Sequence, residues 1–193
     1  MLEPNEKRNE ATSEKRRGGG RTRRLARMLI GLFVIAAIVL IAGQLRILDG
    51  VYERLFGPPD LGNVAFERLM RRSTPNDALA CPPGECGSAE VDIRPPAFPM
   101  AAGALRRRVR AYLAAQGADL VGSDDTSLHD RFVCRTTLMR FPDTVDVEIL
   151  PLDAEHATLA IYSRSQLGYY DFGVNLRRIR AILEALGPAV ASA

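Results

Sequence analysis

The longest apolar run in the chain lies near its N-terminus, over the 18 residues from Met28 to Leu45, and contains no charged side chain. A helix of this length extends about 27 Å, close to the thickness of a bilayer core. A buried core helix is the alternative, but such a helix usually shows a polar stripe. We therefore predict a transmembrane signal anchor over residues 28–48, with the membrane as its partner. Its amphipathic continuation to Phe56 is expected to extend into the interface.

Basic side chains are concentrated before this run. Residues 1–27 contain nine Lys and Arg against four Glu, a net charge of +5, whereas the remaining residues contain 17 basic and 19 acidic ones, a net charge of −2. Because positive flanks stay in the cytoplasm, we expect a disordered basic cytoplasmic tail over residues 1–27 and an exported C-terminal domain. The domain lacks the charge of a nucleic-acid binder, so we expect no nucleic-acid partner.

A cleaved signal peptide is the alternative to a retained anchor. Secretory signals have a shorter apolar region that ends in small residues. Here the run is longer, and the bulky Ile41 precedes Ala42 and Gly43. These features favour the retained anchor.

Turn-forming residues dominate residues 49–99, which are rich in Pro and Gly. We interpret this segment as a linker, part of which wraps the domain as extended chain. Cys81 and Cys86 enclose a Pro-Pro-Gly sequence, and an exported domain lies in an oxidising compartment, so we expect a disulfide between them. Redox chemistry, metal binding and free thiols are the alternatives. The third cysteine, Cys134, falls on the apolar face of a predicted strand and is expected to be a buried free thiol.

Two helical patterns enclose four strand-like runs over residues 100–187. The first amphipathic pattern covers residues 101–116, with its arginines expected on the solvated face, and the second covers residues 174–186. The runs between them are short and separated by turns, which favours an antiparallel meander. We predict an α+β fold in the order α-β-β-β-β-α, a small antiparallel four-stranded sheet with helices on one face and the other face partly open. A disordered tail is expected over residues 188–193.

Three sequence segments resemble one known family. TLAIYSRSQLGYYDFGVNLRRI, residues 158–179, ends a strand in Ser-Arg-Ser, passes through a turn with Gly and Asp, and enters a helix at Asn. With LMRFPD at 138–143 and FERLMRRSTPNDALACPP at 66–83, it resembles the bacterial and plastid family called domain of unknown function 1499 (DUF1499), in its membrane-anchored bacterial type. The resemblance covers about residues 60–187. Together with the basic flank of the span, it leads us to expect a single-pass protein of the bacterial inner membrane with its N-terminus in the cytoplasm and its C-terminal domain in the periplasm. The resemblance implies no reaction.

The Ser-Arg-Ser segment and the helix after it form the candidate ligand site, whose residues are Ser163, Arg164, Ser165, Asp171, Asn175 and Arg140. One interpretation is structural: Asn175 caps the helix and Asp171 pairs with Arg164 or Arg140. The other is functional, because a helix N-terminus, flexible glycines and an arginine together attract a carboxylate or phosphate.

The histidines limit the catalytic alternatives. A serine nucleophile needs a His or Lys base, and the domain has no Lys and only His129 and His156, both expected in exposed turns. His129 with Asp125 and Asp130 lacks convincing metal-ligand spacing, so we expect no metal and no cofactor. The sequence favours a non-enzymatic envelope domain that binds a partner protein or a small anionic ligand at the outer face of the membrane. The alternative is an enzyme acting on a cell-envelope substrate at the Ser-Arg-Ser corner.

Overall fold

The computed structural model describes residues 23–41 and 46–187. It divides into two compact units, 1–45 and 46–193. In the first unit the helix Arg23–Ile41 has a mean hydropathy of 2.3 and no buried side chains, so it is a candidate membrane span by length and composition. This helix includes residues 23–27, which the sequence placed in a disordered tail. The rest of that tail, residues 42–45 of the predicted anchor and the tail 188–193 lie outside the described residues.

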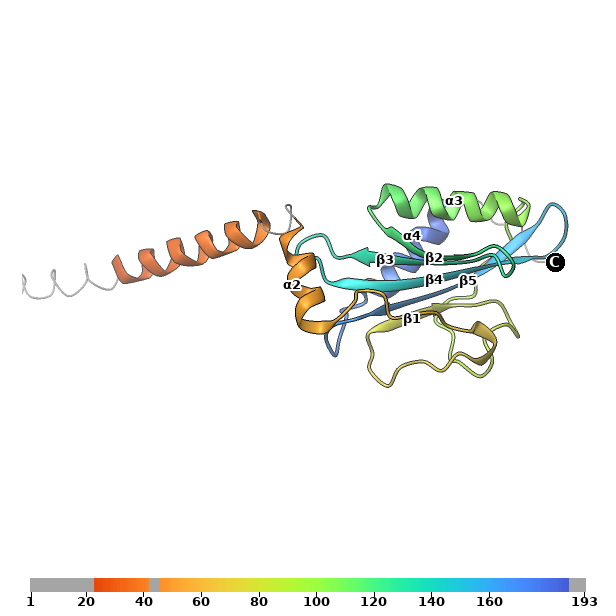
Figure 1. The fold of residues 1–193 in the computed structure, drawn as a ribbon, viewed down its shortest axis with the longest axis horizontal. Coiled ribbons are helices and arrows are strands. Elements are labelled where there is room, and N and C mark those ends of the chain that lie inside the picture. Colours follow the sequence, from red (N-terminus) through yellow and green to blue (C-terminus); the bar gives the residue numbers. More distant parts are fainter. Residues whose placement is uncertain (1–22, 42–45, 188–193) are drawn as a thin grey trace, which may run out of the picture. The chain divides into compact units, whose positions relative to one another are not determined.

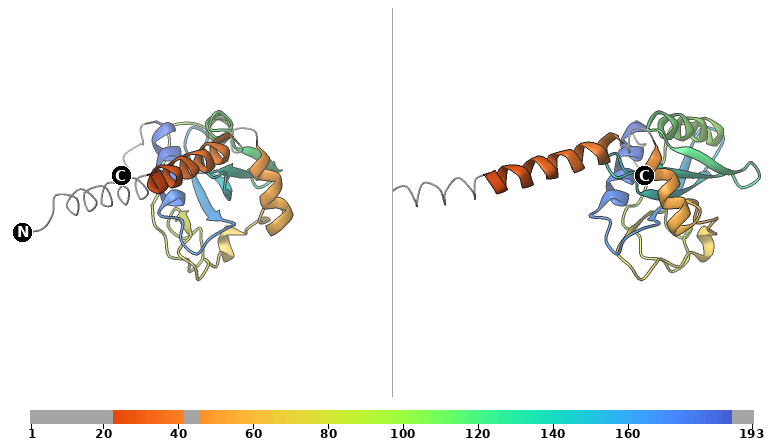
Figure 2. Two further views of the ribbon diagram at one scale, coloured as in Figure 1. Left: turned by 90° about the vertical axis from the view of Figure 1, so that its left-hand side faces the viewer. Right: turned by 60° about the vertical axis from the view of Figure 1, so that its left-hand side comes forward.

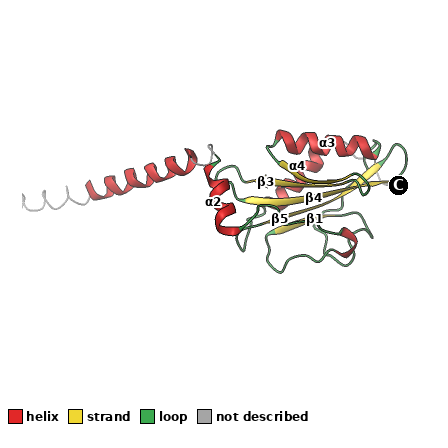
Figure 3. Cartoon of the chain, in the orientation of Figure 1, coloured by secondary structure: helices red, strands yellow, loops and turns green. Residues whose placement is uncertain are grey.

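The second unit is an α+β domain with one antiparallel sheet, as predicted (Figure 3). Its elements in chain order are α2 (Ile47–Phe56), η1 (Phe66–Arg68), β1 (Asp77–Ala80), α3 (Ala102–Ala115), β2 (Asp119–Asp124), β3 (His129–Arg135), β4 (Pro142–Pro151), β5 (Ala157–Ser165) and α4 (Val174–Ala185). The sheet has five strands in the order β1-β5-β4-β3-β2, one more than predicted. The meander expected from the short turns is confirmed for β2 to β5.

The fifth strand, β1, comes from the segment interpreted as a linker. It pairs antiparallel with β5, so that Asp77 lies opposite Arg164 and Ala80 opposite Ile161. Ala78, Leu79 and Ala80 are all buried, because both faces of the sheet are covered at this point. A strand that is buried on both sides shows no alternation of apolar and polar residues, which explains why the pattern did not reveal it.

One face of the sheet is covered by α3 and α4 (Figures 1 and 2). Leu105, Val109 and Leu113 of α3 and Ile179 and Ile182 of α4 are buried against aliphatic side chains of β4 and β5. Alternate residues of each strand point to this face, so the periodicity of the sequence predicted this core correctly.

Arg106 departs from the expected solvated face of α3. It is buried, and its guanidinium contacts Asp130 of β3 at 2.8 Å and Asp125 at 2.7 Å. Arg110, one turn later, contacts the same Asp130 at 2.6 Å. Burial alone would raise the pKa of Asp130, but the hydrogen bonds from Arg110 and Arg106 lower it to about 2. These ion pairs hold α3 to the edge of the sheet.

The opposite face is covered by the coil of residues 57–76 and 81–92, which includes η1 and which Figure 1 shows on the other side of the sheet from α3. Phe66 and Leu69 pack there against Leu79 and Tyr162. Phe98, further along the chain, is buried instead in the core under α3 and α4.

This coil covers the sheet over β1, β5, β4 and β3, whereas β2 at the edge is exposed, with Leu120 48% and Val121 40% accessible. The partly open face that we expected is therefore limited to this edge strand. The domain consists of three layers: helices, sheet and coil.

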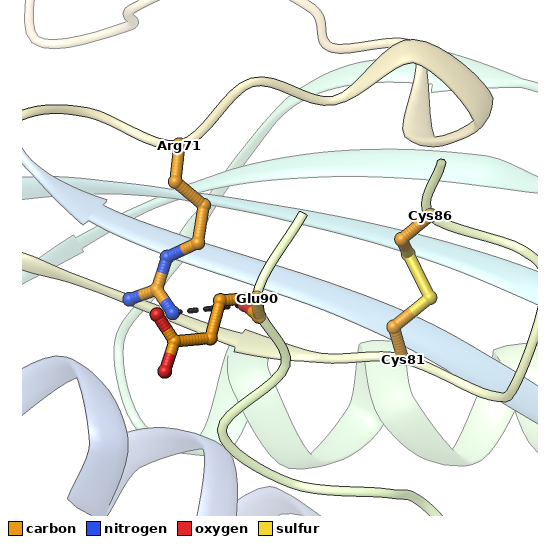
Figure 4. Close-up of a disulfide and its surroundings, with 4 residues drawn as sticks. All are labelled: Arg71, Cys81, Cys86 and Glu90. Atoms are coloured by element: carbon orange, nitrogen blue, oxygen red, sulfur yellow. Dashed lines mark hydrogen bonds between the residues drawn. A yellow bond between two sulfur atoms is a disulfide. The ribbon is translucent and has the colours of Figure 1, made fainter. Parts of the chain in front are cut away.

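A disulfide closes part of this coil (Figure 4). Cys81 follows β1 and bonds to Cys86, with their Cα atoms 6.3 Å apart, and both side chains are buried in the coil-side core. Close by, Arg71 donates to the carbonyl oxygen of Glu90 at 3.0 Å. The predicted disulfide is confirmed, and Cys134 is the buried free cysteine that the pattern of its strand predicted.

Candidate functional site

Four of the six candidate residues come together on the helix-covered side, where β5 ends and α4 begins. The side chain of Asn175 is fully buried; its amide accepts from Ser163 Oγ at 2.6 Å and donates to Ser165 Oγ at 2.9 Å. It also donates to the carbonyl oxygen of Asn76 at 3.0 Å, just before β1. This amide therefore joins β1, β5 and α4.

Asp171, and not Asn175, caps the helix. The N-cap position of α4 is Gly173, and Asn175 lies inside the first turn. The two carboxylate oxygens of Asp171 accept from the backbone N–H groups of Gly173 at 2.9 Å and Asn175 at 2.8 Å. The predicted capping role thus belongs to Asp171, whose own carboxylate occupies the place of an anion at the positive end of the helix.

Arg164 lies on the other face of the sheet. It contacts Asp146 of β4 at 3.2 Å and donates to the carbonyl oxygen of Gly62 in the coil. Asp146 is fully buried and also contacts His129 Nε2 at 3.1 Å. The predicted pair between Arg164 and Asp171 is therefore wrong, because side chains of consecutive strand residues point to opposite faces.

Arg140 lies apart from both groups, in the loop between β3 and β4. Its guanidinium contacts Asp49 of α2 at 2.8 Å and 2.6 Å, so it also does not pair with Asp171. Burial would raise the pKa of Asp49, but the hydrogen bond from Arg140 and the charge of Arg135 keep it below its usual range. Arg140 thus fastens α2 to the domain.

The described residues bring no base to the two serines. His129 is buried on the coil-covered face against Asp146, and His156 contacts Asp153 at 2.8 Å in the turn before β5. The exposed turn expected for His129 is therefore wrong. Within residues 23–41 and 46–187, no group of three His, Cys, Asp or Glu side chains could hold a metal ion. Burial raises the pKa of the Cys134 thiol to about 11, which opposes thiolate chemistry there.

Two cavities that the sequence did not indicate adjoin this corner. We call the first the apolar cleft; it has a volume of about 430 Å³ and lies between the β3–β4 loop and the β5–α4 loop. Its apolar lining consists of Leu138, Met139, Phe141, Leu167, Tyr170 and Phe172. We call the second the arginine cavity; it has a volume of about 390 Å³ and lies between α3, α4 and the end of β3. Thr136 and Val174 line both cavities.

The arginine cavity is lined by three arginines and by no carboxylate. Arg135 is paired with Asp119, and Arg178 with Asp143. Arg177 is exposed and donates to the carbonyl oxygen of Phe172 at 2.8 Å, and no described carboxylate lies within 4.0 Å of it. The cavity therefore carries one cation whose charge is not balanced by a described neighbour.

Strained backbone marks both loops of the apolar cleft. Arg140 has a φ of 57° and Phe172 a φ of 53°, in the left-handed region that bulky residues rarely adopt. Each such residue costs on the order of 1–3 kcal/mol, and strain of this kind concentrates at functional sites. The strain supports the cleft as the candidate functional site.

One comparison with known proteins gives a match. A family described as "Protein of unknown function (DUF1499)" matches residues 68–186, which cover β1 to α4 and both cavities. A search of the curated proteins finds no match to the chain.

Proposed function

Since this chain belongs to the DUF1499 family, whose function is unassigned, we propose a function from the geometry of its own domain. The domain binds an amphiphilic anion without transforming it. The apolar cleft takes the apolar part of this ligand, and the arginine cavity takes its carboxylate or phosphate. The observation that carries the proposal is that a mainly apolar cavity and a cavity lined by three arginines share the lining residues Thr136 and Val174.

The apolar cleft supplies the affinity for a chain or ring. Burying apolar surface of a ligand contributes about 25 cal/mol per Å². Leu138 and Phe172, which line the cleft, are 55% and 86% exposed. A bound ligand would therefore remove apolar surface of the protein, as well as apolar surface of the ligand, from water. Pockets that bind small molecules commonly combine such an apolar lining with a few polar groups.

The arginine cavity supplies the charge selectivity. Arg177 has no described ion-pair partner, and a guanidinium binds a carboxylate or phosphate through two parallel hydrogen bonds. The N-terminus of α4, by contrast, is already capped by Asp171. The anion that the sequence suggested at the helix terminus is therefore proposed to bind about one turn further along, at Arg177.

The contacts of the two serines give little support to an enzyme at the Ser-Arg-Ser corner. Ser163 is fully buried and bonded to Asn175 and Arg178, and Ser165 is bonded to Asn175. A serine nucleophile requires a neighbouring base, and neither described histidine contacts either serine. These residues support a structural role, and the binding role is proposed for the cavities beside them.

We propose further that the helix Arg23–Ile41 anchors the protein in a bacterial inner membrane, with the domain in the periplasm. The excess of arginine before the span and the disulfide of Cys81 and Cys86 both support this orientation. An alkaline phosphatase fused after residue 187 is expected to be active in growing bacteria. An inactive phosphatase in an abundant fusion would contradict the orientation.

Binding is tested with dodecyl phosphate, titrated calorimetrically below its micelle concentration into residues 46–193, a compact unit with its own core. We expect Arg177→Gln to weaken binding about tenfold, which is about 1.4 kcal/mol. Arg180→Gln is the matched control, because Arg180 is exposed on the same helix and lines neither cavity.

A second titration separates charge from apolar contact. Dodecyl trimethylammonium carries the same alkyl chain with the opposite charge, so we expect it to bind at least tenfold more weakly. Equal binding of both amphiphiles would contradict the anionic part of the proposal. If Arg180→Gln weakened dodecyl phosphate binding as much as Arg177→Gln, Arg177 would act only through the total positive charge of α4 and not through its position in the arginine cavity.

A further inference from the structure

Helix α2 has more apolar surface than the domain covers. At about 100° per residue, Ile47, Val51 and Leu55 fall within about 80° of one another on one side of the helix. Leu48 and Tyr52 continue the apolar arc on the adjacent side. The polar residues occupy the rest of the circumference, so α2 is amphipathic about an unusually wide apolar arc.

Only part of this arc faces the domain. Tyr52 packs against Phe141 with ring centroids 5.3 Å apart, and Asp49 contacts Arg140 at 2.6 Å. Leu48, Asp49 and Tyr52 are accordingly half-buried. These contacts fix the orientation of α2 relative to the loops that line the apolar cleft.

The other part of the arc is exposed. Ile47, Val51 and Leu55 are 54%, 43% and 68% accessible to solvent. No residue of α2 is buried, and within residues 46–187 nothing packs over this stripe. Aliphatic side chains repeated along one side of an exposed helix mark an interaction surface.

The covalent chain indicates what covers the stripe. Ile47 follows Ile41, the last described residue of the candidate membrane span, by six residues. Six residues of fully extended chain reach at most about 22 Å. If the span crosses a bilayer, the covalent chain keeps the start of α2 within that distance of the end of the span, close enough for α2 to reach the headgroup layer. Arg54 flanks the exposed stripe, as basic residues flank the apolar side of interfacial helices.

We propose that α2 is an interfacial membrane helix: Ile47, Val51 and Leu55 insert into the lipid surface that the preceding helix crosses. The contacts of Tyr52 with Phe141 and of Gln166 Nε2 with the carbonyl oxygen of Pro58, at 2.6 Å, then hold both loops of the apolar cleft beside the bilayer. The lipid surface is the source from which an amphiphile enters the cleft. Insertion of α2 does not depend on what the cleft binds, so it stands or falls separately from the proposed function.

The chain contains no tryptophan, so a single introduced indole reports on its own surroundings. We choose Leu55→Trp for the exposed stripe and Met70→Trp as the matched control, because Met70 is 87% exposed in the coil between η1 and β1. Leu32→Trp, in the helix Arg23–Ile41, reports on the span. The full chain with each substitution is placed in nanodiscs of phosphatidylglycerol and phosphatidylcholine, with or without brominated acyl chains.

Brominated lipid is expected to quench at least half of the Leu55→Trp emission and at least half of the Leu32→Trp emission, and to leave the Met70→Trp emission unchanged. Equal, weak quenching of Leu55→Trp and Met70→Trp would overturn the proposal, whether or not Leu32→Trp is quenched. A blue-shifted but unquenched Leu55→Trp emission would also overturn it, because protein, such as a second copy of the chain, would then cover the stripe. Binding of dodecyl phosphate to residues 46–193 is measured without lipid, so failure of one proposal is distinguishable from failure of the other.

Discussion

The sheet face under α3 and α4 is lined mainly by aliphatic side chains, whereas the face under the coil carries Asp146, Arg164 and His129. Both faces are covered over β1, β5, β4 and β3, whereas β2 at the edge of the sheet is exposed. The helix-covered face is stabilised by apolar burial, and the coil-covered face by a disulfide, a small apolar cluster and ion pairs. The difference teaches that alternation of apolar and polar residues does not by itself identify a solvent-exposed face, because a charged residue can be buried with its partner.

On the helix-covered face, the buried hydrogen bonds of Asn175 with Ser163 and Ser165 are polar contacts within an apolar core. We therefore expect substitution of Asn175 to destabilise the fold most. Asn175→Ala removes a buried amide and leaves the hydroxyls of Ser163 and Ser165 and the carbonyl of Asn76 short of partners. We expect a loss of about 3–4 kcal/mol in the free energy of unfolding, measured by urea denaturation of residues 46–193. Arg180→Ala, exposed on the same helix, is the control and should change it by less than about 0.5 kcal/mol.

Removal of a buried ion-pair partner on the coil-covered face should lower the free energy of unfolding almost as much. Arg164→Ala leaves the fully buried Asp146 with His129 as its remaining partner and removes the link to Gly62 in the coil. We expect a loss of about 2–3 kcal/mol by the same measurement, with Arg107→Ala on the exposed side of α3 as the control. A stable Arg164→Ala protein that no longer binds dodecyl phosphate would contradict the structural role and would indicate that Arg164 contacts the ligand.

A smaller effect with a distinct pH dependence is expected at the edge of the helix-covered face. The pKa of Asp130 is lowered to about 2 in the folded domain and is near 3.9 in an unfolded chain. Its ion pairs with Arg106 and Arg110 therefore stabilise the fold fully above about pH 4, and this contribution is lost as the pH falls toward 2. Asp130→Asn should cost about 2 kcal/mol at pH 7, and the difference from the unsubstituted domain should shrink between pH 4 and pH 2. A difference that stays constant over this range would contradict the ion-pair account.

Much of the fold was predictable from its periodicity. The helices over 102–115 and 174–185 and the meander from β2 to β5 follow from apolar residues at spacings of three to four or of two. Strand β1 was not predictable, because Asp-Ala-Leu-Ala is too short and too evenly buried to alternate. Arg106 was also not predictable, since its partner Asp130 lies 24 residues away and only the folded sheet brings them together.

The candidate site was predictable only in part. The proximity of Ser163, Ser165, Asp171 and Asn175 was predicted correctly, because only a short turn separates the end of β5 from the start of α4. The alternation of β5 could have separated Arg164 from Ser163 and Ser165, since consecutive side chains of a strand point to opposite faces of the sheet. The two cavities depend on long-range packing of α3, α4 and two loops, so no local pattern indicated them.

The most direct test of the central claim is to locate the ligand. Thr136 and Val174 line both cavities, and each carries methyl groups that isotope-filtered NMR can detect. With dodecyl phosphate bound to residues 46–193, we predict intermolecular NOEs from the methylenes next to the phosphate to both residues, and from the far end of the chain to Leu138. NOEs confined to the exposed stripe of α2, or to Leu120 of β2, would show that the alkyl chain binds apolar surface elsewhere and would contradict the account.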